Sequence, residues 1–79
     1  MKDQLYIVTL VKGGYYDKKD VVDTVVMYAA DTRSARDEAQ RTMIANGENL
    51  AGLAFRASKA SETQAVKAIK NGARNWTEL

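Results

Sequence analysis

Residues 4–12, QLYIVTLVK, constrain the fold most, because this segment is apolar on both faces of an extended chain. Alternation places Leu5 and Ile7 on one face and Val8 and Leu10 on the other. β-Branched and aromatic residues at this density are typical of a strand. A strand with two apolar faces is covered on both sides. We therefore predict that this segment is the central strand of a sheet.

Two further segments have the composition of strands. Residues 21–30, VVDTVVMYAA, follow the first segment after only eight residues, GGYYDKKD, so the two should form an antiparallel hairpin. Residues 50–58, LAGLAFRAS, form the third predicted strand, with Leu53 and Phe55 on one face. Consecutive elements tend to lie side by side, which favours antiparallel pairing of the third strand with the first, opposite the second. The predicted order is 2-1-3.

A long helix is predicted between the second and third strands. Its sequence, DTRSARDEAQRTMIANG, offers Asp31 or Thr32 as the N-cap and ends at an Asn-Gly pair that is typical of a helix C-terminus. Ala35, Ala39 and Met43 fall on one stripe. Alanines in that stripe allow the helix axis to lie close to a sheet.

A short second helix is predicted after the third strand. Ser61 to Gln64, SETQ, fits a capping box, and the following AVKAIKNG ends at another Asn-Gly pair. Val66, Ile69, Ala73 and Trp76 recur at helical spacing, so the tryptophan should fold back onto the body. The fold class is therefore α+β, with a ββαβα order, a three-stranded antiparallel sheet and the long helix on one face, in one domain spanning residues 1–79.

The residue types argue against catalysis. The 79 residues include no cysteine and no histidine, which removes disulfides, zinc sites and the commonest general base. Ser58, Lys59 and Ser61 are better explained as the start of a helix than as a catalytic group. We predict a protein that is not an enzyme and that uses no metal and no cofactor.

Charge and hydropathy limit the partners. No window approaches the roughly 20 apolar residues that span a membrane, and the first residues do not resemble a signal peptide, so a cytoplasmic location is expected. The net charge of +2 is too mild for a general nucleic-acid binder. From residue 52 onward the charge is +3, and the first 51 residues carry −1. One end of the molecule should therefore be basic.

The loop between the first two strands is one candidate binding surface. Tyr15 and Tyr16 are rigid and amphipathic, and Lys18 and Lys19 beside them could attract an acidic or phosphate-bearing partner. The alternative is that the hairpin extends through both tyrosines, with Gly13-Gly14 as a bulge and residues 17–20 as the turn. The sequence leaves both interpretations open.

A second candidate surface combines the basic residues of the C-terminal third, Arg56, Lys59, Lys67, Lys70 and Arg74. Lys67 and Lys70 are three residues apart on the second helix, and Arg74 is expected to continue their row opposite Val66 and Ile69. This row is either a solvated helix face or a patch for phosphates or acidic protein. Trp76 is either a core anchor or a platform on which a base stacks.

The layout resembles a known class of small proteins. YIVTLV, VVMYAADTRSARDEAQRTM and AGLAFRAS, within residues 5–58, resemble the strand–strand–helix–strand layout of small phage-encoded inhibitors. The layout is similar to anti-CRISPR proteins that act on type I complexes, and to the small phage inhibitor of host RNA polymerase. The resemblance carries no diagnostic motif and assigns no residues, and the short second helix departs from the smallest members.

This resemblance implies a stoichiometric inhibitor that occupies a surface of a host nucleoprotein complex in the host cytoplasm. The complex is either a CRISPR effector, which we favour slightly, or RNA polymerase. Many such inhibitors imitate DNA through a strongly acidic surface, which a chain of net charge +2 does not offer. Two other functions remain open. One is a small nucleic-acid-binding module that uses the basic surface, and the other is a homo-oligomer joined through an open strand edge. The expected state is a monomer or a weak homodimer.

Overall fold

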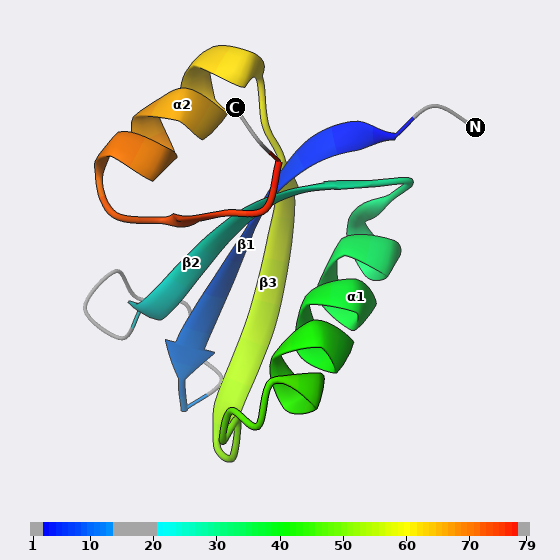
Figure 1. The fold of residues 1–79 in the computed structure, drawn as a ribbon, viewed down its shortest axis with the longest axis vertical. Coiled ribbons are helices and arrows are strands. Elements are labelled where there is room, and N and C mark those ends of the chain that lie inside the picture. The colour runs from blue at the N-terminus through cyan, green and yellow to red at the C-terminus, as the bar shows by residue number, and fades with distance from the viewer. Residues whose placement is uncertain (1–2, 14–20, 78–79) are drawn as a thin grey trace.

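The structure is a computed structural model that describes residues 3–13 and 21–77. Four strands and two helices follow one another in the order ββαβαβ (Figure 1). Their bounds are β1 Gln4–Lys12, β2 Val21–Ala29, α1 Thr32–Ala45, β3 Leu53–Lys59, α2 Glu62–Lys70 and β4 Arg74–Asn75.

The strands form one mixed sheet in the order β3-β1-β2-β4. Strand β1 pairs antiparallel with β2 and β3, which confirms the predicted order of the three long strands. The prediction of a three-stranded, purely antiparallel sheet is corrected by β4, which pairs parallel with β2. Gly72, at φ +103°, turns the chain back after α2, and the Trp76 N–H then donates to the Val26 carbonyl at 2.9 Å.

Helix α1 covers one face of this sheet. The register pairs Tyr6 with Met27 and Val8 with Val25, so these side chains share the α1 face. The predicted stripe of α1, which consists of Ala35, Ala39 and Met43, packs against these side chains and is fully buried. The core on this face consists of Tyr6, Val8, Leu10, Val25, Met27, Ala29, Ala35, Ala39 and Met43.

The ends of α1 follow local chemistry. Of the two predicted N-caps, Asp31 is the one used: its carboxylate accepts the Ser34 N–H at 2.7 Å. This hydrogen bond lowers the pKa of Asp31 below its ordinary value. The helix ends at Ala45, before the predicted Asn46-Gly47 stop. The chain then turns, and the third strand begins at Leu53 rather than at residue 50, because Gly52 adopts φ +77° in the preceding turn.

Helix α2 lies on the opposite face of the sheet from α1 (Figure 1). It contacts β1 and β2, and Val26, whose side chain alternates with those on the α1 face, is fully buried. The predicted capping box is confirmed: the Gln64 N–H donates to Ser61 Oγ at 3.1 Å, and the Ser61 N–H donates to Gln64 Oε1 at 2.9 Å. The fully buried residue of α2 is Ala65.

Candidate functional site

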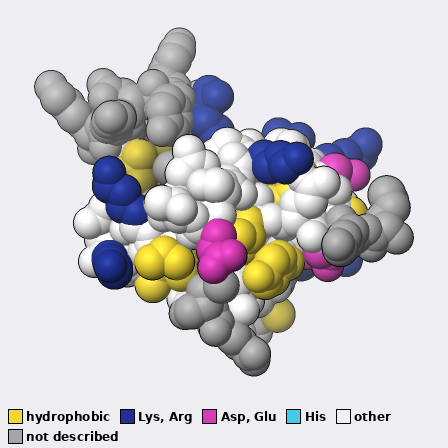
Figure 2. All heavy atoms as spheres, turned by 90° about the horizontal axis from the view of Figure 1, so that it is seen from above, with side chains coloured by type: hydrophobic (Ala, Val, Ile, Leu, Met, Phe, Trp, Pro, Cys, Tyr) yellow, Lys and Arg dark blue, Asp and Glu magenta, His cyan; other side chains and the backbone are white. Residues whose placement is uncertain are grey.

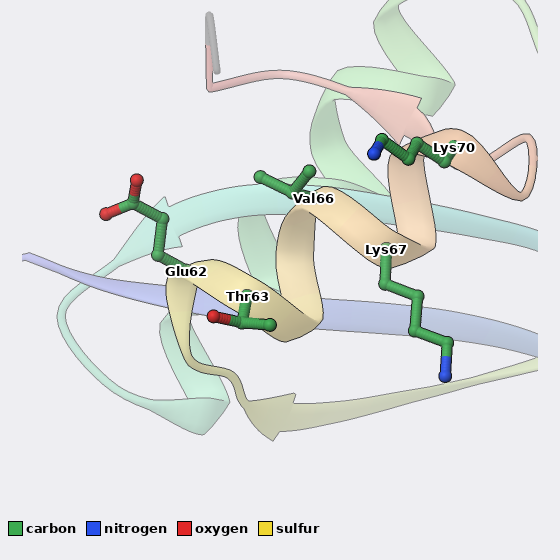
Figure 3. A pocket seen from close by; sticks show the side chains of 5 residues that line it. All are labelled: Glu62, Thr63, Val66, Lys67 and Lys70. Carbon is green, nitrogen blue, oxygen red and sulfur yellow. The ribbon is translucent and has the colours of Figure 1, made fainter.

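The exposed face of α2 forms a hollow of about 520 Å³. Five side chains of this helix line it, and Figure 3 shows them on successive turns. They are Glu62, Thr63, Val66, Lys67 and Lys70. This set, the α2 face, includes two of the lysines that the sequence predicts as binding residues.

Local sequence explains why these five residues share a face. The capping box at Ser61 begins the helix at Glu62, and Ala65 is the position that packs on the sheet. A helix with Ala65 turned inward presents the positions of the α2 face outward. The prediction that Val66 lies opposite the lysines is therefore wrong, because the small Ala65 allows close packing where the larger valine was expected.

Charge on the α2 face is arranged along the helix. Glu62 lies in the first turn, whereas Lys67 and Lys70 lie in the last, and each sign matches the helix dipole. Figure 3 shows the Lys70 side chain curled back toward Val66, while Lys67 points away from both. The site therefore presents two ammonium groups in different directions around a half-buried apolar side chain.

Arg56 and Lys59 do not extend this row, because they lie on opposite faces of β3. Arg56 pairs with Thr9 and lines a smaller hollow of about 260 Å³ on the α2 side of the sheet. Lys59 pairs with Tyr6, whose side chain faces α1. The pairing register therefore separates two residues that the sequence groups together.

Arg74 forms a structural contact and does not continue the row of Lys67 and Lys70. Helix α2 ends at Lys70, so Arg74 lies on β4. Its Nη1 and Nη2 donate to Glu48 Oε2 and Oε1 at 2.9 and 2.7 Å, and Nη2 lies 2.7 Å from Asp23 Oδ2. We call these three residues the Arg74 triad.

Contacts within the triad shift the pKa of two of its members, Glu48 and Arg74. The side-chain hydrogen bond from Arg74 lowers the pKa of Glu48, and the same bond, followed by the nearby charge of Asp23, raises the pKa of Arg74. Sequence reasoning missed both carboxylates, since Asp23 and Glu48 lie in separate segments with no shared spacing. The triad joins β2, the turn after α1 and β4.

Trp76 and the tyrosine loop complete the predicted set. Trp76 is partly buried and packs against the α1-side core, which confirms the core-anchor interpretation, although it reaches the core from the chain after β4 and not from a helix. The four loop candidates, Tyr15, Tyr16, Lys18 and Lys19, lie outside the described residues. Whether that loop is a contact surface stays a prediction.

The face of the molecule drawn in Figure 2 is mixed in character. Figure 2 shows lysine and arginine side chains spread over one face among acidic and apolar ones, without a single large cationic patch. Within residues 3–13 and 21–77, no three acidic residues are grouped so that they could hold a metal ion. The helices in this part of the chain are all too short or too polar to cross a membrane.

Comparison with known proteins adds no relative: no family model, no curated protein and no solved structure matches this chain.

Proposed function

We propose that this protein is a non-enzymatic inhibitor that binds a host nucleoprotein complex, and that a CRISPR–Cas effector is its target. The α2 face carries this proposal. Lys67 and Lys70 supply positive charge beside the half-buried side chain of Val66, which contributes apolar contact area. A partner surface that places carboxylates around an apolar side chain is complementary to this arrangement.

A protein surface suits the α2 face better than a nucleic-acid backbone. Phosphate binding needs several cations along a continuous path, because each contributes a separate contact. On the α2 face the two lysines point in different directions, and Glu62 lies at the other end of the hollow (Figure 3). The mixed surface in Figure 2 supports the same choice.

The test is retention on tagged host complexes. A purified type I CRISPR effector and a purified bacterial RNA polymerase are each immobilised, and the protein is passed over both. We expect retention on the effector and loss of retention in the double variant Lys67→Glu, Lys70→Glu. The matched control is Arg33→Glu, Arg41→Glu, which changes the charge equally on exposed positions of α1 and should keep binding.

The other possible results of the retention experiment each point to a different function. Retention on RNA polymerase alone would move the target to the transcription machinery. Absence of retention on both complexes would contradict the inhibitor proposal. If DNA or RNA binds instead, with affinity that falls steeply as salt is added, the protein is a nucleic-acid-binding module.

A further inference from the structure

The outer edge of β3 is the longest strand edge that the described part of the chain leaves without a partner strand. Two hydrogen bonds show which backbone groups of β3 point toward β1 and which point away from it. The Ala60 N–H donates to the Leu5 carbonyl at 2.9 Å, and the Gly13 N–H donates to the Gly52 carbonyl at 3.2 Å. Hydrogen-bonded pairs alternate along an antiparallel ladder. The even-numbered residues of β3 therefore bond to β1, and the backbone groups of Phe55, Ala57 and Lys59 point outward.

A groove runs beside this edge. It has a volume of about 340 Å³ and lies between α1 and β3. Leu53 and Phe55, both half-buried, form its apolar wall, and Arg36, Asp37 and Gln40 of α1 form its polar wall. In Figure 1, α1 and β3 lie side by side. Outward backbone groups next to an apolar wall are the two features that strand addition requires.

Charge indicates which kind of chain segment binds at the β3 edge and in its groove. Arg36 and Lys59 are exposed at the groove and at the end of the edge, and Arg56 is exposed on the other face of β3. The acidic residue of the groove, Asp37, already lies 3.9 Å from Arg33. Strand β3 contains Arg56 and Lys59 and no carboxylate, so a second copy of this edge would only add further cations beside these cations. An acidic segment would gain attraction from each of them.

We propose that an extended acidic segment of a partner protein adds to the edge of β3 as a fifth strand. The backbone of this segment forms hydrogen bonds with the outward backbone groups of Phe55 and Ala57. Its apolar side chains enter the groove beside Leu53 and Phe55. Its carboxylates lie near Arg36 and Lys59. The seven residues of β3 span roughly 23 Å, which accommodates a segment of about seven residues. This inference does not depend on the α2 face or on the proposed target.

The experiment is a titration of the ¹⁵N-labelled protein with a synthetic capped acidic peptide, Val-Thr-Glu-Thr-Val-Thr-Glu, followed by amide NMR to about 1 mM peptide. Valine and glutamate occupy every second position, so in an added strand both face α1, where the groove, Arg36 and Lys59 lie. We expect the largest shifts at the amides of Phe55, Ala57 and Lys59, with smaller shifts at Arg56 and Ser58, whose N–H groups bond to β1. The lysine–valine peptide, in which lysine replaces each glutamate, should produce no localised shifts.

Two kinds of variant separate the contribution of backbone hydrogen bonds to peptide binding from the contribution of charge. Ala57→Pro removes one outward N–H without touching the ladder to β1, and proline is tolerated on edge strands, so the acidic peptide should bind about tenfold more weakly. Arg36→Glu with Lys59→Glu keeps every backbone group and should exchange the preference, binding the lysine–valine peptide instead. Arg41→Glu is the control, because Arg41 lies beside Met27 of β2, away from β3, and this variant should bind the acidic peptide as the unmodified protein does.

Three outcomes would overturn the proposal. The first is an absence of shifts at β3 with the acidic peptide. The second is an equal response to both peptides, which would show that charge does not select the occupant. The third is a set of β3 shifts that depends on protein concentration without peptide, which would assign the edge to a second copy of the chain.

Discussion

Replacing Met43 by alanine tests the packing of α1 on the sheet. Met43 is fully buried among the residues of the α1-side core. The change removes three heavy side-chain atoms, which at about 0.8 kcal/mol for each methylene-sized group gives roughly 2.4 kcal/mol. The cavity left behind adds to this, and the higher helix propensity of alanine offsets only a few tenths of a kcal/mol. We expect a loss of about 3 kcal/mol in the free energy of unfolding.

Thermal unfolding followed by circular dichroism measures this loss. For a domain of this size, about 3 kcal/mol corresponds to a fall in Tm of roughly 12–24 °C. The neighbouring residue provides the matched control, because Ile44 is 57% exposed and Ile44→Ala should cost under about 1 kcal/mol. If Met43→Ala destabilises the protein no more than Ile44→Ala does, the helix does not pack on the sheet through this stripe.

Three further predictions concern the cap, the triad and the loop. Ser61→Ala removes one hydrogen bond of the capping box and should cost about 1 kcal/mol in urea unfolding, whereas an unchanged midpoint would show that α2 does not need its cap. Because Arg74 lowers the pKa of Glu48 below the ordinary 4.5, their contact stabilises the fold above that pH and is lost as the pH falls through the lowered pKa. Arg74→Gln should therefore destabilise the protein at neutral pH and flatten the decline in stability as the pH falls below 4.5; an equally steep decline in the variant would exclude this linkage. Tyr15→Ala with Tyr16→Ala should leave Tm unchanged and weaken retention on the effector, and a lower Tm with full retention would show that the loop is only a turn.

Local patterns predicted the elements that depend on neighbouring residues. The stripe of Ala35, Ala39 and Met43, the capping box at Ser61 and the order of the long strands all follow from spacing within one segment or from its immediate neighbours. These signals are strong because the same residues that form the element also determine which side is buried.

The remaining features depend on contacts between distant segments. Strand β4 has only two residues, so it carries no periodicity, and it exists through its pairing with β2 and the contact of Arg74 with Glu48, 26 residues away. The orientation of α2 was mispredicted because hydrophobicity favours Val66 as the inward residue, whereas close approach to the sheet favours Ala65.

The candidate site shows the same division. Lys67 and Lys70 share a face as their spacing predicts. Arg56, Lys59 and Arg74 are close to them in sequence but lie on other surfaces, because strand alternation and the end of α2 separate them. A count of basic residues along the chain could not distinguish these positions.

The alanine stripe of α1 has a consequence for selectivity. Ala35 and Ala39 are fully buried and set how near the helix axis comes to the sheet. That separation also fixes the width of the opening where a ligand side chain would sit next to Phe55. Bulkier residues at either alanine would lift the helix and widen the opening. The size of side chain admitted is thus governed by two interior positions that the incoming molecule never touches.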